Sequence, residues 1–457
     1  MNKVQSGEKR ATFGSRIGIV FATVGSAVGL GNIWRFPYEL GSNGGAAFLL
    51  VYLICALMLG LPVMIAEFYI GRHSKRNAAG AFHVLAPGTK WSVIGYLGVF
   101  AAFFILGFYF VIAGWTLEYF FQSLTSSLGG KSAETFEMEF NNFSSGIFRP
   151  IMWVVIFIMM THFIISTGVK KGIERSAKLL MPLLFVMLIV LCIRSLTLPG
   201  AMAGLDFLFR PDLSKINSSV LLSAMGQAFF SLSIGMGCMI TYASYFGDKT
   251  KLQRTALEVT AIDTILALLA GIMIFPAVFN FGIAPTAGPE LVFITLPNVF
   301  GQMPLSNLWS CIFFILLTVA ALTSTISLHE VATAYLHEEH QITRKRAAWL
   351  VSFGVCILAC ISSLSFGTIK NVTLFGLTFF DLLDYITAKI MLPFGGMLIC
   401  IFVGWRIDRK ILKAELTNKG TVPFYFFTIY CFLIRYIAPV AICFIFLNEL
   451  GLLNFIK

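Results

Sequence analysis

The stretch FATVGSAVGLGNIWRFPYE, residues 21–39, begins as an apolar membrane-spanning helix and then fills with glycine. Glycine weakens a helix, and Asn32 and Arg35 follow at membrane depth. A broken helix is tolerated in a bilayer only where protein or a water-filled cavity surrounds it. An arginine at that depth is costly and marks a functional site by default. The stretch therefore predicts a helix that unwinds to offer its carbonyls and amides to a polar ligand. Helix packing through Gly25-x-x-x-Gly29 is the alternative, but it leaves Asn32 and Arg35 unexplained.

The chain is far more hydrophobic than a soluble protein. Of its 457 residues, 58% are hydrophobic and 12% are charged, whereas a soluble domain carries about 25% charged residues. The apolar runs are continuous, unlike the alternating strands of a β-barrel. We therefore expect one all-α polytopic membrane domain with about eleven transmembrane helices. The expected spans are residues 15–40, 46–71, 92–124, 148–167, 173–196, 217–246, 256–282, 305–336, 347–366, 374–405 and 423–449.

The net charge of +11 is unevenly distributed. Basic residues gather in alternate loops, and the 283–304 loop has none, which is the positive-inside pattern and argues against a nucleic-acid partner. We expect a cytoplasmic N-terminus and, after an odd number of spans, a C-terminus outside. The clusters are Arg72, Lys75 and Arg76; Lys170, Lys171, Arg175 and Lys178; Lys249, Lys251 and Arg254; Arg344, Lys345 and Arg346; and Arg406, Arg409, Lys410 and Lys413.

Signals for other chemistries are weak. The nine cysteines lie in apolar segments without a CxxC pair, which predicts buried free thiols. The segment His337–His340 reads HEEH and lacks the histidine spacing of a zinc protease, so a solvated helix end is the better interpretation. No GxxxxGK[ST] nucleotide motif occurs, and the histidines are scattered. We expect that the protein is not an enzyme.

A second glycine-rich break lies in the sixth expected span. Residues 229–237 read FFSLSIGMG. Two interrupted spans in corresponding positions indicate an inverted-repeat transporter with a binding site at the membrane midplane. Half-helix N-termini attract a carboxylate, and half-helix C-termini with free carbonyls suit Na⁺ or an ammonium group, so an amino acid is favoured. The alternative is a kinked helix whose serines only pack.

Other polar residues lie at matching depth. Thr323-Ser324-Thr325 is in the middle of a span, although its hydroxyls could bond their own helix. Asp263 lies about two turns into the seventh expected span and needs a cation or a donor. The phenol of Tyr109 needs a partner, and Asp384 could pair with Arg35 on the outer side.

The chain resembles the neurotransmitter:sodium symporter family, in its bacterial amino-acid branch. The motifs GSAVGLGNIWRFPY, NGGAAF, GQAFFSLSIGMG, ITYASY, GPELVFITLP and ALTSTISLHE occur in family order and spacing along nearly the whole chain. The resemblance implies a single transporter domain, residues 1–457, with the LeuT-type 5+5 inverted repeat and unwound first and sixth helices. The repeats would be residues 15–196 and 217–405, with an additional helix at 423–449.

The resemblance implies two sodium sites and a substrate site between the broken helices. The first sodium would be bound by the Ala27 carbonyl, Asn32, Ser231, Asp263 and the substrate carboxylate. The second would be bound by the carbonyls of Gly25, Val28 and Ala320 and the hydroxyls of Thr323 and Ser324. The substrate carboxylate would meet Leu30, Gly31 and Tyr109, the ammonium group would meet carbonyls of Ala27, Phe230, Ser231 and Ser233, and the side chain would face Ile105, Tyr109, Phe230, Met236, Ser324 and Leu328.

The family's gates also carry over. Arg35 and Asp384, with Tyr109 and Phe230 as a lid, would close the outside. The inside would be closed by Arg10, Glu338, Phe13 and Tyr245; Glu338 replaces a common Asp and Phe13 a common Trp. Gly172 and Pro182 match a Gly-x9-Pro pattern associated with unwinding of the fifth helix, with an ordinary kink as the alternative.

We therefore expect a sodium-coupled symporter that imports a small L-amino acid, hydrophobic or aromatic, across the cell's inner (plasma) membrane. Asp263 would replace the chloride of other members, because the position one turn later is Ala267, which cannot bind an anion; Tyr52, Gln227 and Ser231 would hydrogen-bond the carboxylate. Proton antiport is a linked hypothesis. The alternative is a transport-inactive amino-acid sensor or a channel-like protein on the same fold.

Overall fold

The structure, a computed structural model, describes residues 11–125, 131–282 and 291–452. Within these ranges nine helices are long and apolar enough to cross a membrane. They are α3–η2–α4 (Ala46–Ser74), α6 (Ser92–Leu124), α8 (Phe148–Ser166), η3–α9 (Val169–Leu196), α13 (Leu252–Asn280), α15 (Ser306–Glu339), α16 (Arg344–Leu364), α17–η6–α18–η7 (Phe379–Arg406) and α20–η8–α21 (Phe427–Glu449).

Two further spans are broken. The first consists of α1 (Arg16–Ala27), followed by η1 (Gly31–Arg35) and α2 (Phe36–Ser42), with a bend of 53° at the break. The second consists of α11 (Ser218–Ser231) and α12 (Cys238–Ala243), which are too short to cross a membrane separately. The nine continuous helices of the described ranges and the first broken pair make ten candidate spans, and α11 and α12 occupy the position of the sixth expected span. Both breaks confirm that the first and sixth helices unwind.

The backbone between α11 and α12 needs glycine. Gly235 and Gly237 have φ values of 86° and 74°, in the left-handed region that side chains disfavour. A Cβ added to Gly235 would lie 2.5 Å from the Leu392 carbonyl oxygen. The motif SIGMG therefore ends the helix because it allows both the turn and the close approach of α18 (Leu392–Ile401).

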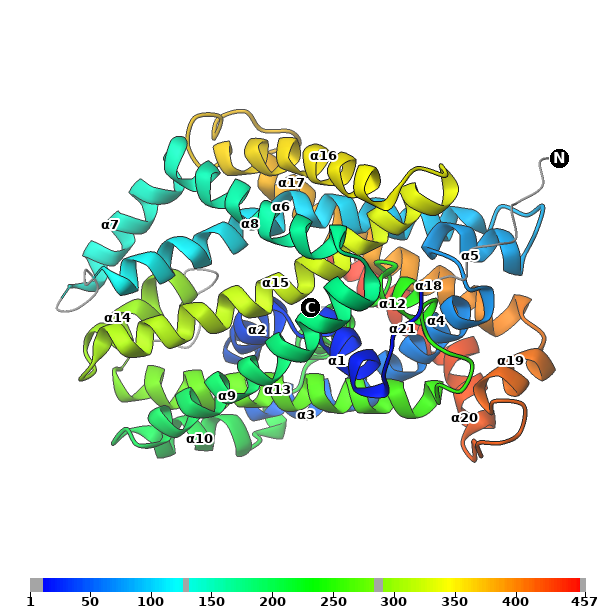
Figure 1. Ribbon diagram of the computed structural model, residues 1–457. Coiled ribbons are helices and arrows are strands. Elements are labelled where there is room, and N and C mark those ends of the chain that lie inside the picture. The colour runs from blue at the N-terminus through cyan, green and yellow to red at the C-terminus, as the bar shows by residue number, and fades with distance from the viewer. Residues whose placement is uncertain (1–10, 126–130, 283–290, 453–457) are drawn as a thin grey trace.

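The broken helix α1 lies inside the bundle. It packs against α15, α9, α13 and α12, and Figure 1 shows it near the middle of the molecule, between α15 and α13. The residues of α1 from Ala22 to Ala27 are buried. The break after Ala27 is thus surrounded by protein, which is the condition under which an unwound helix is tolerated in a membrane.

Short helices lie at the two ends of the bundle. The connecting helices α5 (Ala78–Leu85) and α19 (Arg409–Leu416) lie at one end, and α7 (Ala133–Ser144), α10 (Ala201–Phe209) and α14 (Leu296–Gly301) lie at the other (Figure 1). The first end also holds the basic loops that sequence analysis assigns to the cytoplasm. The span count was predictable from hydrophobicity, whereas these short helices were not expected.

Candidate functional site

The backbone at the first break touches two neighbouring helices. Val28 is extended, with φ −76° and ψ 111°. A Cβ added to Gly29 would lie 2.2 Å from Ser324 Oγ on α15 and 3.0 Å from Tyr109 Oη on α6. These contacts leave no room for a side chain, so Gly29 allows α6 and α15 to reach the unwound backbone directly.

The structure brings together residues expected to hold the substrate carboxylate. The Leu30 amide donates a hydrogen bond to Tyr109 Oη over 3.1 Å. Gly31 faces the Phe230 ring, because a Cβ added there would lie 2.9 Å from Phe230 Cε1. An amide at the start of a helical segment, where anions are favoured, and a phenol hydroxyl therefore lie next to each other at the first break.

Three polar side chains expected at the first sodium site form one buried cluster. Asn32 Nδ2 donates to Asp263 Oδ1 over 2.8 Å and to Ser231 Oγ over 3.1 Å. The Ser231 hydroxyl donates to Asp263 Oδ2 over 2.7 Å. Each of the three residues is at most 1% exposed. The cluster joins η1, α11 and α13, which lie far apart in the sequence.

No cationic side chain of the described residues pairs with the Asp263 carboxylate. Its hydrogen bonds come from the neutral groups of Asn32 and Ser231. Burying an unpaired carboxylate is strongly unfavourable. The surrounding groups offer oxygen ligands, which a hard cation prefers, so the donor set fits Na⁺. In the structure the amide nitrogen of Asn32 faces the carboxylate, and a role as a sodium ligand requires the amide to turn its Oδ1 inward.

The residues expected to hydrogen-bond the Asp263 carboxylate differ in their contacts. Ser231 contacts Asp263 directly, and Tyr52 Oη donates to Ser231 Oγ over 3.4 Å. Gln227 instead donates to the Gly31 carbonyl over 3.3 Å. Ala267 is buried and offers no polar atom.

Oxygens expected at the second sodium site also converge. Thr323 Oγ1 lies 3.4 Å from the Val28 carbonyl oxygen and 2.9 Å from that of Ala320. Ser324 Oγ lies 3.5 Å from the Val28 carbonyl oxygen. A Cβ added to Gly25 would lie 3.3 Å from Thr323 Cβ. The set is all-oxygen and fits Na⁺, although the bond to Ala320 alone would satisfy Thr323 within its own helix.

Hydrogen bonds join the second break to the first break and to Glu67, a residue that was not expected at the site. Ser233 Oγ donates to the Ser26 carbonyl over 2.8 Å. The Gly235 amide donates to Glu67 Oε1 over 2.7 Å, and Glu67 is fully buried in α4. The lone carboxylate in the apolar run LPVMIAEFYIG was the signal that could have identified this residue. The expected pocket residues Ile105, Met236 and Leu328 are buried, and Phe230 is half-buried.

The outer-gate residues lie near the site, but the expected ion pair is not formed. The Arg35 guanidinium lies 4.5 Å from the Phe230 ring centroid, a cation–π contact. Its ion pair is with Glu39, at 3.7 Å. No ion pair to Asp384 occurs among the described residues. Glu39 lies one turn along the same helical segment, so Arg35 reaches it at little cost in side-chain order.

The inner-gate residues Phe13 and Tyr245 belong to a dense network of aromatic and polar contacts. The Phe13 ring packs edge-on against Tyr242 and Tyr245, with centroids 5.9 Å and 6.0 Å apart. Tyr245 Oη donates to Glu330 Oε1 over 2.6 Å, and Glu330 also pairs with Arg344. The Glu330–Arg344 pair was not expected from the sequence. Glu338 accepts hydrogen bonds from Asn77, and the expected partner Arg10 lies outside the described residues.

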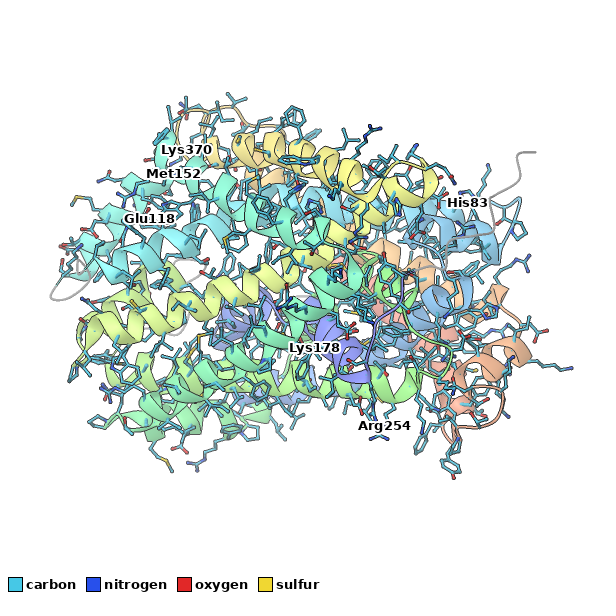
Figure 2. All side chains as sticks on the ribbon, viewed as in Figure 1. His83, Glu118, Met152, Lys178, Arg254 and Lys370 are labelled. Atoms are coloured by element: carbon cyan, nitrogen blue, oxygen red, sulfur yellow. The ribbon has the colours of Figure 1, made fainter. Side chains whose placement is uncertain are left out.

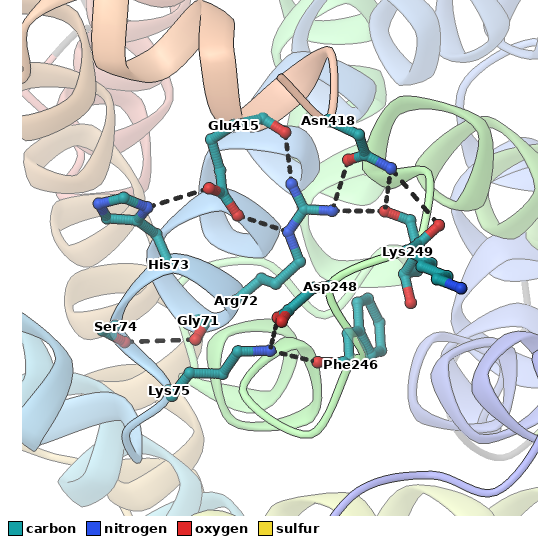
Figure 3. A network of polar contacts seen from close by, with 11 residues as sticks. Gly71, Arg72, His73, Ser74, Lys75, Phe246, Asp248, Lys249, Glu415 and Asn418 are labelled. Carbon is teal, nitrogen blue, oxygen red and sulfur yellow. Dashed lines mark hydrogen bonds and ion pairs between the residues drawn. The ribbon is translucent and has the colours of Figure 1, made fainter. Parts of the chain in front are cut away.

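Figure 3 shows a second polar network, around Arg72. Arg72 is 2% exposed and donates to Glu415, to the Asn418 side chain and to the Thr250 carbonyl. Burial raises the pKa of the Glu415 carboxyl, but the hydrogen bond from His73 and the charge and hydrogen bond of Arg72 outweigh it and lower the pKa to about 2. The network ties α4 to α19 and to the loop before α13.

Gly172 and Pro182 lie in one span. Gly172 is in the π-helical segment η3 (Val169–Glu174), and Pro182 is inside the continuous helix α9 (Arg175–Leu196). The helix is locally widened at Gly172. Its expected unwinding stays a prediction.

The two broken helices and the buried polar site between them define a membrane transporter of the LeuT type. A model of the sodium:neurotransmitter symporter family matches residues 10–142 and 130–455. The uncharacterized sodium-dependent transporter YhdH of Bacillus subtilis is 38% identical over 450 residues, which cover 98% of this chain and 100% of YhdH. An uncharacterized sodium-dependent transporter of Haemophilus influenzae is 36% identical, covering 97% and 99% of the two chains.

The fold is similar to a solved transporter structure. The crystal structure of MhsT in complex with L-phenylalanine has a TM-score of 0.89 and 46% sequence identity, and the match covers 96% of this chain and 100% of MhsT. The chain belongs to the sodium:neurotransmitter symporter family and is a multi-pass, sodium-dependent transporter. This confirms the family and the fold that the motifs indicated.

Proposed function

We propose that the protein is a sodium-coupled symporter that imports a small L-amino acid with a hydrophobic or aromatic side chain. The observation that carries the proposal is Asp263, a fully buried carboxylate that no cation of the described ranges pairs with, beside the unwound backbone at Val28 and Gly29. A sodium ion among Ala27, Asn32, Ser231 and Asp263 supplies the missing positive charge. The substrate carboxylate completes the same site, so ion and substrate stabilise each other.

The unwound segments hold the two charged ends of the amino acid. The amides of Leu30 and Gly31 and the Tyr109 hydroxyl bind the carboxylate. This is supported by the Leu30–Tyr109 hydrogen bond, which holds both groups side by side at the first break. Carbonyls of Ala27, Phe230, Ser231 and Ser233 accept the ammonium group, because half-helix C-termini carry partial negative charge.

The side-chain pocket is apolar. Ile105, Met236 and Leu328 line it, with Phe230 and Tyr109 above, and Ser324 adds a hydroxyl. Methionine is flexible and polarizable, so the pocket adapts to bulky groups. The similarity to MhsT, which was solved with L-phenylalanine, supports this choice of substrate class.

A second sodium ion stabilises the contact between the first break and α15. The carbonyls of Gly25, Val28 and Ala320 and the hydroxyls of Thr323 and Ser324 bind it. The distances between Thr323, Ser324 and the Val28 carbonyl support this set. Because a ligand drives a conformational change only through differential affinity, the ions favour the state in which these oxygens converge.

The transporter alternates between a state closed on the outer side and a state closed on the inner side. Arg35 and Asp384, with Tyr109 and Phe230, close the outer side, and Arg10 and Glu338, with Phe13 and Tyr245, close the inner side. The N-terminus lies in the cytoplasm and the C-terminus outside the plasma membrane, which the basic loops support. Each unit of charge that moves inward adds about 2.3 kcal/mol per 100 mV of membrane potential.

Transport does not require chloride. Asp263 supplies the negative charge beside the first sodium, and Ala267 lacks an anion ligand. After sodium leaves on the inner side, the carboxylate takes up a proton for the return step, which gives proton antiport.

Equilibrium binding tests the substrate and the coupling. Purified protein should bind radiolabelled L-phenylalanine only with Na⁺, and L-leucine and L-tryptophan should compete while glycine, L-glutamate and dopamine should not. Met236→Phe should narrow the pocket and weaken L-tryptophan most. Binding of equal strength in Na⁺ and in choline would contradict the proposal. A sensor on this fold would bind the amino acid without transporting it, and uptake by proteoliposomes distinguishes a sensor from a transporter.

A further inference from the structure

Two cavities adjoin at the cytoplasmic end of α13. The first, the basic cavity, has a volume of about 310 Å³ and lies between the start of α1, the loop 247–251 and the start of α13. Its walls carry Arg16, Lys249, Lys251 and Arg254. Figure 2 shows Arg254 in the half of the molecule that carries His83, away from Glu118 and Lys370. The basic cavity thus lies at the end that carries the basic loops.

Among the described residues, carboxylates neutralise only part of the charge of the basic cavity. Arg16 and Arg254 share one carboxylate, Glu258, with Arg254 Nε 3.0 Å from Glu258 Oε1. Lys249 and Lys251 have no ion pair among the described residues (Figure 3 shows Lys249). Four cations and one shared carboxylate leave an excess of positive charge.

Neighbouring carboxylates do not supply the missing charge. Glu174 lies beside the start of α1 and pairs with Lys178 at 2.6 Å, and Asp248 pairs with Lys75 at 2.9 Å. The N-terminus of α13 adds to the positive potential, because it has no side-chain cap and no acidic residue in its first turn. The basic cavity therefore favours an anion.

The second cavity, the apolar groove, has a volume of about 640 Å³ and shares Lys251 and Arg254 with the basic cavity. It lies between the η2–α4 span, α13 and residues 422–433. Leu57, Leu257 and Ile429 line it and are 53%, 49% and 53% exposed. These residues belong to membrane-spanning helices, so the groove opens toward lipid.

We propose that the basic cavity and the apolar groove form one binding site for an anionic glycerophospholipid of the cytoplasmic leaflet. The phosphate lies near Lys249 and Lys251, and an acyl chain follows Leu57 and Leu257 along the groove. Basic pockets between membrane helices on the cytoplasmic side suit such headgroups, and the shared residues Lys251 and Arg254 make the charged and the apolar surface adjacent, as one amphipathic molecule needs. The inference rests on the proposed orientation of the chain, but not on the identity of the transported substrate.

Native mass spectrometry of the purified full-length protein tests the site. Dioleoylphosphatidylglycerol should bind at least tenfold more tightly than dioleoylphosphatidylcholine. Lys249→Gln/Lys251→Gln should remove that preference, because each basic residue contributes to anionic-lipid affinity. The matched control is Lys345→Gln/Arg346→Gln, which removes two exposed cations from another cytoplasmic cluster and should keep the preference. An equal loss of the phosphatidylglycerol preference in both double variants would overturn the site. An unchanged preference in Lys249→Gln/Lys251→Gln would also overturn it.

Two further arms separate the parts of the site. Leu257→Trp narrows the groove and should weaken binding of the phosphatidylglycerol severalfold. Glycerol 3-phosphate at equal concentration should not displace the lipid; displacement would show a site for a soluble phosphate and overturn the lipid proposal. Sodium-dependent L-phenylalanine binding is measured on the same samples. Lipid selectivity without amino-acid binding would leave the lipid site standing and would contradict only the proposed transport function.

Discussion

The side-chain amide of Asn32 donates to the Asp263 carboxylate over 2.8 Å, between positions 231 residues apart in the sequence. This bond joins the broken first helix to α13 at the place where we propose sodium to bind. The amide nitrogen is a neutral partner for a buried charge, and it satisfies the carboxylate only partly. A sodium ion between the two residues, with the amide reversed, compensates the charge better.

Asp263→Asn keeps the shape of the side chain and removes its charge. Sodium affinity, measured from the Na⁺ dependence of L-phenylalanine binding, should fall at least tenfold, which corresponds to about 1.4 kcal/mol. The thermal midpoint should change little, because an uncompensated buried charge is also removed. Unchanged sodium affinity in a folded variant would show that Asp263 does not bind the ion.

Gly29→Ala should abolish substrate binding at ordinary concentrations. The new Cβ would lie 2.2 Å from Ser324 Oγ and 3.0 Å from Tyr109 Oη, so one of these groups must move. Both are proposed to line the site, and misplacement by an ångström is costly for a pre-organised site. The double variant Gly29→Ala/Ser324→Ala removes the nearest clash and should recover part of the substrate affinity. Full L-phenylalanine affinity in Gly29→Ala would contradict the close approach of Ser324 and Tyr109 to the backbone at Gly29.

Thr323→Ala and Ser324→Ala should weaken sodium dependence more than folding. Each removes an oxygen ligand proposed for the second ion and leaves the Val28 carbonyl less well satisfied. Ser327→Ala is the matched control, because its hydroxyl donates to the Ser324 carbonyl of its own helix. Sodium titrations of L-phenylalanine binding should shift severalfold for the first two variants only. If all three keep wild-type sodium affinity, Thr323 and Ser324 only bond their helix.

The Arg72–Glu415 network predicts an acid-sensitive contribution to stability. The pKa of Glu415 is lowered from 4.5 to about 2, so its ionised form favours the folded state. This contribution is complete above pH 4.5 and is lost as the pH falls toward about 2. Glu415→Gln should lower stability near pH 7 by roughly 1–3 kcal/mol, because Arg72 stays buried without its counter-charge.

Thermal unfolding of the wild type and Glu415→Gln, followed between pH 7 and pH 3 in detergent, measures this effect. The difference between the two midpoints should shrink as the pH falls below 4.5. A difference that stays constant over this range would mean that Glu415 contributes through packing and not through its charge. Lys345→Gln serves as a surface control and should change neither curve.

The fold was largely predictable from the sequence because each membrane helix has a local signal, a long hydrophobic run. Hydrophobic length located the spans, and glycine at 25, 29 and 31 and in SIGMG located both breaks. The buried clusters were partly predictable, since Asp263 and Asn32 are expensive at membrane depth without a role. The contact between Asp263 and Asn32 depends on tertiary packing, and their spacing in the sequence does not predict it.

Pairings between distant residues were harder to predict. Arg35 pairs with Glu39 and not with Asp384, because the nearer carboxylate lies on the same helical segment. Glu67 was overlooked as one acid among apolar residues, although it accepts a hydrogen bond from the second break. Arg72 looked like a solvated loop residue, but α19 buries it, and that short helix has no hydrophobic signal of a membrane span.

Sodium-driven uptake by proteoliposomes tests the central proposal most directly. An inward Na⁺ gradient should accumulate radiolabelled L-phenylalanine above its equilibrium level, equally in chloride and in gluconate, and an inside-negative potential should increase the uptake. Asp263→Asn should not accumulate substrate in gluconate. Wild-type protein that binds L-phenylalanine but gives no accumulation, or that accumulates it without a Na⁺ gradient, would contradict sodium-coupled symport. Uptake that collapses without chloride would show that the negative charge assigned to Asp263 is misplaced.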